Sequence, residues 1–124
     1  MARSSGEAEL TGIVKGASHS LGFQALAEDM GMTLSLHVLS DATAAIGICR
    51  RRGLGKIRHL HVSDLWIQER LKTGDFSLSK IDGVDNPADL LTKHVERSTL
   101  HRLMPVLNLW PEDGRPSLAP YLTQ

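Results

Sequence analysis

Two short segments of this sequence have the pattern of β-strands, and the residues between them are helical in pattern. Residues 33–39 carry apolar side chains at alternate positions, and Leu39 adds one to the opposite face. This pattern predicts a largely buried strand. Residues 76–81 predict a second strand. Because a helical crossover joins the two strands, they should lie parallel in one sheet, which predicts an α/β fold.

The segment before the first strand has an apolar residue every three or four positions, as an amphipathic helix does. These residues are Leu10, Ile13, Val14, Ala17, Leu21 and Ala25. We expect the helix to end near Met30, with Gly31 in the left-handed conformation beyond its last turn. Gly12, Gly16 and Gly22 lie within it. Each either lowers its stability by roughly 1 kcal/mol relative to Ala or allows close packing against a sheet.

Further helical segments follow each strand. A short helix is expected at 44–48 and a longer one at 58–72. Another opens at Asn86-Pro87, since Asn is a good N-cap and Pro fits the first helical position. A last helix is expected at 99–107. Sheets usually have more than two strands, and a two-stranded parallel sheet offers little surface for this number of helices to pack on. We therefore expect that further strands come from elsewhere or that the chain is part of a larger domain.

The composition is that of an ordinary globular protein of 124 residues, enough for one domain. Hydrophobic residues make up 41% and charged residues 23%, so wholesale disorder is not expected. Fourteen basic residues balance fourteen acidic ones, which excludes a strongly basic protein but allows a local patch. No apolar run is long enough for a membrane span, so no membrane partner is expected. The single cysteine and the lack of a signal-peptide pattern favour an intracellular location, in cytoplasm or nucleus.

Three acidic positions lie where an α/β sheet gathers ligands. Glu7 or Glu9 is in the first turns of the opening helix, Asp41 follows the first strand, and Asp89 begins the helix after the second strand. Carboxylates that converge at the carboxyl ends of parallel strands can bind Mg²⁺, which prefers oxygen ligands. Two such ions about 4 Å apart can promote phosphodiester cleavage. Each acid also fits a capping or helix-dipole role, so both interpretations stay open at this point.

Positive charge is concentrated in one segment, and no acidic residue occurs between Asp41 and Asp64. Its cationic residues are Arg50, Arg51, Arg52, Lys56 and Arg58. Such a segment can contact nucleic-acid phosphates without reading the base sequence, and the alternative is a solvated loop. Cys49 precedes it, and a buried structural thiol is favoured over a nucleophile because the sequence identifies no catalytic partner.

Three segments, taken in order, form a known pattern: residues 4–10 read SSGEAEL, residues 40–45 read SDATAA, and residues 86–93 read NPADLLTK. They resemble the SSxEAEY, xDNxxA and xxADxLTK motifs in the ribonuclease H domain of copia-type retrotransposon Pol polyproteins. Between them, residues 56–60, KIRHL, are similar to that family's RTKHI segment. The resemblance covers about residues 3–109.

The resemblance implies a ribonuclease H-like fold whose four carboxylates hold two Mg²⁺ (or Mn²⁺) ions. Such a site hydrolyses the RNA strand of an RNA–DNA hybrid. On the motif match, Glu9, Asp41 and Asp89 are the catalytic carboxylates and metal ligands. Glu9 is preferred to Glu7 because, as in the family, a hydrophobic residue follows it and a small residue lies three positions on.

Two departures from the family limit the expected activity. The family's first aspartate lies on a strand of an initial three-stranded meander, and this sequence contains no counterpart of either. The Asn of the second motif is Ala42. We therefore expect an incomplete ribonuclease H-like domain at 1–109 and a C-terminal extension at 110–124, inactive as an isolated chain. Upstream polyprotein segments would supply the missing strands.

The alternative is a non-catalytic remnant of a transposable element. It would bind an RNA–DNA hybrid or another nucleic acid through the basic 50–58 segment.

Overall fold

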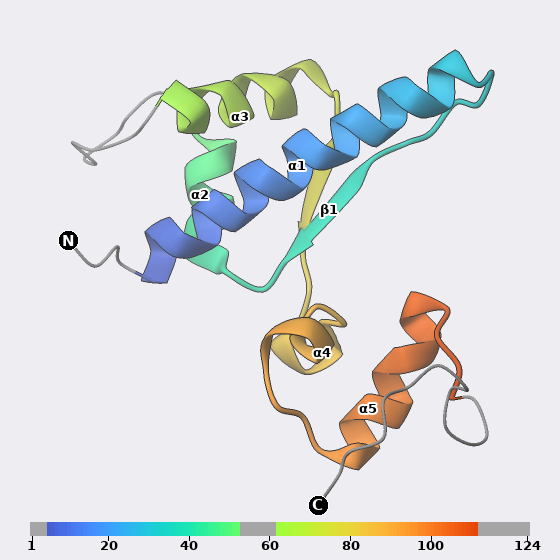
Figure 1. The fold of residues 1–124 in the computed structure, drawn as a ribbon. Coiled ribbons are helices and arrows are strands. Elements are labelled where there is room, and N and C mark those ends of the chain that lie inside the picture. Colours follow the sequence, from blue (N-terminus) through green and yellow to red (C-terminus); the bar gives the residue numbers. More distant parts are fainter. Residues whose placement is uncertain (1–4, 53–61, 112–124) are drawn as a thin grey trace, which may run out of the picture. The chain divides into compact units, whose positions relative to one another are not determined.

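The structure is a computed structural model that describes residues 5–52 and 62–111. The chain forms two compact units, Met1–Val84 and Asp85–Gln124. The first unit contains helices α1 to α3 and strands β1 and β2 (Figure 1). It is a mixed α/β arrangement, as predicted. None of the described helices is both long and apolar enough to cross a membrane.

Helix α1 spans Ser5–Asp29 and ends as the sequence predicts. Gly31 has a φ of +82°, in the left-handed region. The N–H of Gly31 donates to the carbonyl of Glu28, and the N–H of Met32 donates to that of Ala27. This pair of hydrogen bonds is the Schellman arrangement that closes the last turn of a helix.

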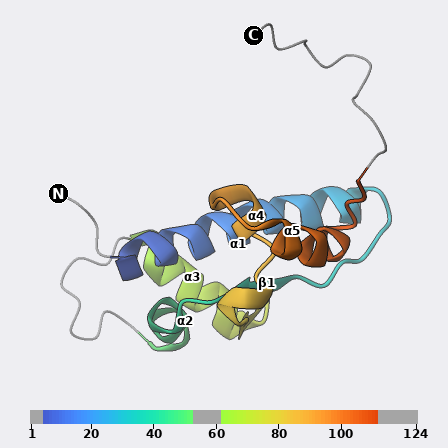
Figure 2. The same ribbon diagram turned by 90° about the horizontal axis from the view of Figure 1, so that it is seen from below.

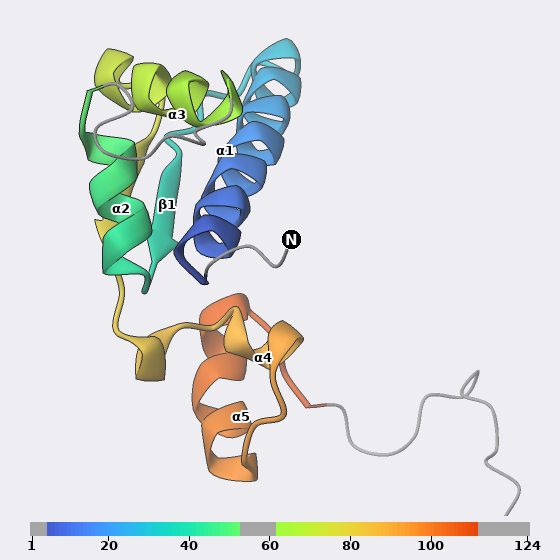
Figure 3. The ribbon, with the colours of Figure 1, turned by 90° about the vertical axis from the view of Figure 1, so that its left-hand side faces the viewer.

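The two strands are parallel, as predicted. Strand β1 is His37–Ser40 and β2 is Ser77–Lys80, with Val38 paired to Leu78. Two backbone hydrogen bonds extend the ladder, from the N–H of Ser77 to Leu36 and from the N–H of Ile81 to Ser40. Helix α1 runs beside β1 in the opposite direction (Figure 1, Figure 2 and Figure 3).

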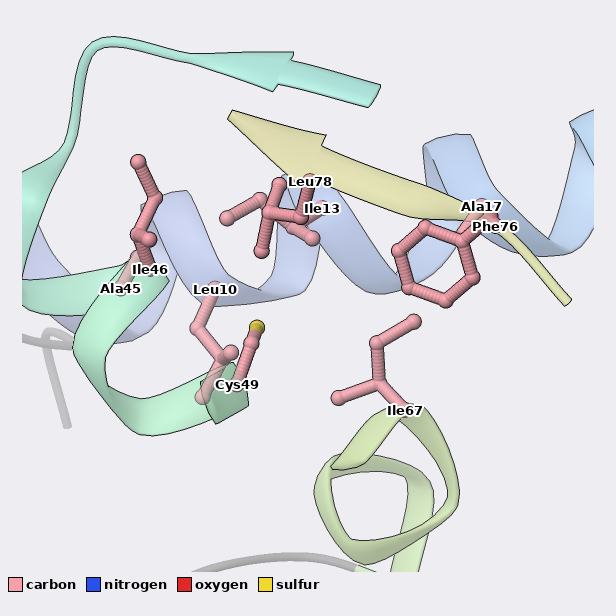
Figure 4. Packing of buried hydrophobic residues seen from close by; sticks show 9 residues of the cluster. All are labelled: Leu10, Ile13, Ala17, Ala45, Ile46, Cys49, Ile67, Phe76 and Leu78. Carbon is pink, nitrogen blue, oxygen red and sulfur yellow. The ribbon is translucent and has the colours of Figure 1, made fainter. Parts of the chain in front are cut away.

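The crossover between the strands is formed by α2, Thr43–Arg50, and α3, Val62–Thr73. Helices α1, α2 and α3 contact one another, and side chains from all three pack in one core with Leu78 of β2 and with Phe76, which precedes that strand (Figure 4). The core residues are Leu10, Ile13, Ala17, Ala45, Ile46, Cys49, Ile67, Phe76 and Leu78. Burial of this cluster is the main driving force available to the unit.

The prediction that the first strand is largely buried is wrong. Leu39 is 49% exposed, and Leu34, which precedes the strand, is 44% exposed. The strand also begins at His37 rather than at residue 33. The helices cover only the face that carries Val38 and Leu78, so the described part of the chain leaves the opposite face of β1 accessible.

The second unit consists of short helices: α4, Asp89–Thr92; α5, Arg97–Leu103; and the 3₁₀ turn η2, Met104–Leu107. The Asn86 side-chain oxygen accepts from the N–H of Ala88, 3.1 Å away. Asn86 thus caps the turn that precedes α4, and α4 begins later than predicted. The expected helix at 99–107 changes to 3₁₀ geometry at Met104. The reason is that Pro105 has no N–H to continue the α-helical ladder.

Gly22, within α1, and Gly31, just beyond its end, should respond oppositely to substitution by alanine. Of the two alternatives that the sequence leaves for Gly22, the structure favours lowered helix stability, because a Cβ added there meets nothing within 4 Å. Gly22→Ala should stabilise the unit by about 1 kcal/mol. Gly31→Ala should destabilise it by about 1–2 kcal/mol, because a Cβ is strained at positive φ. Urea unfolding of both variants measures this, and stabilisation by Gly31→Ala would contradict the assignment.

Candidate functional site

Asp41 lies at the carboxyl ends of both strands. It directly follows β1, and the Ser40 hydroxyl accepts from the N–H of Ala42 at 3.2 Å, which shapes the turn. A Cβ placed on Gly83, just beyond β2, would lie 3.5 Å from Oδ2 of Asp41. The partly buried carboxylate of Asp41 therefore lies close to the start of the 3₁₀ turn η1, Gly83–Asp85, which follows β2.

Glu9 lies on the exposed side of α1, one residue before the buried Leu10. The N-terminal end of this helix and the carboxyl end of β1 lie on the same side of the first unit (Figure 1 and Figure 3). Glu7 is also exposed, and its carbonyl accepts from the Thr11 hydroxyl at 2.9 Å. The choice of Glu9 over Glu7 stays a prediction.

Asp89 belongs to the second unit, where it is the first residue of α4. Its Oδ1 lies 3.1 Å from Nζ of Lys93, one turn later in the chain. A carboxylate in the first turn of a helix, paired with a lysine at i+4, has the structural role that the sequence left open for it. The second unit by itself therefore explains Asp89 without a metal.

The predicted metal ligands divide between the two units: Glu9 and Asp41 in the first, Asp89 in the second. Their carboxylate oxygens have the donor chemistry that Mg²⁺ prefers. Among residues 5–52 and 62–111, however, no three His, Cys, Asp or Glu side chains gather closely enough to hold an ion. The described residues therefore have the type of donor that a two-Mg²⁺ site needs but not the number of donors.

The basic segment is described as far as Arg52, and Lys56 and Arg58 lie outside the described residues. Arg50 donates from Nη2 to the carbonyl of Leu78 at 2.7 Å, which joins the end of α2 to β2. Arg51 is partly buried, and Arg52 is exposed. Arg50 is thus held by a hydrogen bond to β2 and Arg51 is partly buried, unlike the side chains of a fully solvated loop.

A cavity of about 620 Å³ lies between this basic segment and α3. From α3 it is lined by Leu65, Gln68, Glu69, Leu71 and Lys72. Gln68 is fixed by a 2.9 Å hydrogen bond from Nε2 to the carbonyl of Ile48. Sequence reasoning missed these α3 residues, because nothing in their local spacing signals that they face the end of α2.

Cys49 has the buried, structural position that the sequence favours. Burial, and to a smaller extent the negative charge of Asp64, raises the pKa of its thiol from 9.0 to about 11. The thiol is therefore protonated near neutral pH, and a thiolate nucleophile is not available at this position.

No family model, curated protein or solved structure matches the chain.

Proposed function

We propose that this chain is the C-terminal part of a ribonuclease H-like domain of the copia retrotransposon type. The completed domain would hydrolyse the RNA strand of an RNA–DNA hybrid with Mg²⁺. The observation that carries the proposal is the position of Asp41, whose carboxylate lies at the carboxyl ends of two parallel strands. Ligands of open parallel sheets bind at this edge.

In the completed domain, Asp41, Glu9 and Asp89 would hold the ions, and the bound ions would supply the metal chemistry of phosphodiester hydrolysis. The remaining carboxylate would come from added strands. Within the described residues β1 and β2 pair only with each other, so each strand has an unpaired edge. An unpaired edge is a template for a further strand. Upstream polyprotein segments are the proposed source of these strands.

The test is cleavage of a labelled RNA–DNA hybrid in Mg²⁺ or Mn²⁺. The chain is assayed alone and fused to the aspartate-bearing first strands of a copia-type ribonuclease H domain. We expect no cleavage by the chain alone and metal-dependent cleavage by the fusion. Mutation of a residue that only supports a metal ligand lowers metal affinity or activity by about 10- to 100-fold. Asp41→Asn and Asp89→Asn replace proposed ligands directly, so each should lower the cleavage activity of the fusion by about 100-fold or more.

Asp82→Asn is the matched control, because Asp82 is exposed and adjoins Gly83 without belonging to the proposed ligand set. This variant should keep the activity of the fusion. Equal activities of Asp41→Asn and Asp82→Asn would contradict the assignment of Asp41.

The second candidate function is nucleic-acid binding without catalysis. It is favoured by Arg50, Arg51 and Arg52 at the end of α2, beside a cavity that Lys72 also lines. Binding through phosphate contacts weakens steeply with salt. Salt-sensitive hybrid binding by a folded fusion that never cleaves would select this function over the first.

A further inference from the structure

The guanidinium of Arg51 has two buried donors without acceptors. Its Nε and Nη2 atoms are buried and make no hydrogen bond. Arg51 also takes part in none of the ion pairs found among the described residues. Removing a cation from water without a partner is unfavourable, so this arrangement favours a ligand that supplies acceptors.

The two atoms without partners lie on the same edge of the guanidinium. Their N–H bonds point in one direction and form a fork. Such a fork matches two oxygens of one phosphate group, and this paired geometry distinguishes arginine from lysine at phosphate sites.

Arg51 also lines the cavity between the end of α2 and α3. Among the described residues, four cationic side chains line this cavity, Arg50, Arg51, Arg52 and Lys72, against one acidic side chain, Glu69. The excess of positive charge selects an anion. The volume of about 620 Å³ is within the range of small-molecule sites and exceeds what a single phosphate ion needs. It leaves room for the sugar that flanks a phosphate in a nucleic-acid backbone.

We propose that this cavity binds a phosphate group, with Nε and Nη2 of Arg51 as its paired donors. Water does not reach either atom, so binding requires the guanidinium to turn toward the cavity that the same side chain lines. The assignment of the phosphate to a nucleic-acid backbone rests on the proposed function. The binding of phosphate itself does not.

The test measures thermal unfolding of the full chain in phosphate and in chloride at equal ionic strength and pH. A ligand that binds the folded state raises Tm as its concentration rises. We expect phosphate to raise the Tm of the wild type. Arg51→Lys keeps the charge but loses the fork, and should weaken phosphate binding by about 10- to 100-fold. Arg51→Met should abolish the response. Lys15→Met, on the exposed side of α1, is the control and should respond as the wild type does.

A second measurement needs no variant. In the ¹⁵N-labelled wild type, phosphate should shift the Nε–H signal of Arg51 more than that of Arg97, which is on α5 of the second unit. Equal shifts of the two signals, or equal Tm responses of Arg51→Met and Lys15→Met, would overturn the proposal.

A short oligonucleotide distinguishes the two sources of phosphate. Tighter binding of the oligonucleotide than of free phosphate, lost in Arg51→Met, supports a nucleic-acid backbone. If phosphate raises the Tm but neither the oligonucleotide nor the hybrid binds, the result supports the phosphate site in the cavity and contradicts the proposed function. Hybrid binding that Arg51→Met leaves unchanged, with no phosphate response, overturns the cavity site alone.

Discussion

Ile67→Ala is expected to lower the free energy of unfolding by about 2–5 kcal/mol. Ile67 is fully buried, with 0% of its surface exposed, and comes from α3. Figure 4 shows its side chain directed toward Phe76, so truncation leaves a cavity within the core. Single domains are stable by only about 5–15 kcal/mol, so the variant should lose a large fraction of that margin. Urea unfolding followed by circular dichroism measures the loss.

Val62→Ala is the control on the same helix, because Val62 is 84% exposed. Its effect should stay within about 0.5 kcal/mol. Ile67→Val removes one methyl group and should cost about 0.5–1.5 kcal/mol. Equal losses for Ile67→Ala and Val62→Ala would mean that α3 does not pack on the core as described.

The second large effect is a loss of stability at alkaline pH through Cys49. Its thiol ionises near pH 9.0 in the unfolded chain and near pH 11 in the folded one, because burial disfavours the thiolate. The stability from the protonated thiol is therefore complete below about pH 9. It falls as the pH rises toward 11, because the unfolded state ionises first. Between about pH 8 and about pH 11, this group alone should remove about 2 kcal/mol.

The comparison is made against Cys49→Ala, because it isolates the contribution of the thiol. This variant loses packing at every pH but has no thiol to ionise. The difference in free energy of unfolding between wild type and variant should therefore shrink by about 2 kcal/mol at the higher pH. A difference that stays constant with pH would show that the thiol is not buried in the folded state.

Much of the local structure could be predicted from residue spacing. The three- and four-residue spacing of Leu10, Ile13 and Ala17 predicted the buried face of α1, and all three are core residues. Gly31 predicted the end of that helix, because few other residues tolerate positive φ. The helical pattern of the segment that joins β1 to β2 predicted that the two strands are parallel, and they are.

The candidate site was predictable only in part. The position of Asp41 at the end of a strand followed from the sequence, since the apolar alternation stops just before it. The grouping of Asp41 with Glu9 and Asp89 stays a prediction. Asp89 belongs to the second unit, and its neighbour there is Lys93.

The sequence by itself determined the order of the elements, the parallel pairing of β1 and β2 and the end of α1 before Gly31. These depend on periodicity and on turn residues, which act over a few positions along the chain. Only the tertiary structure decided that Leu39 is exposed and that Arg51 is partly buried beside a cavity. Burial and the pairing of a charge depend on which distant segments pack alongside. For Arg51 that segment is α3, whose approach no local spacing encodes.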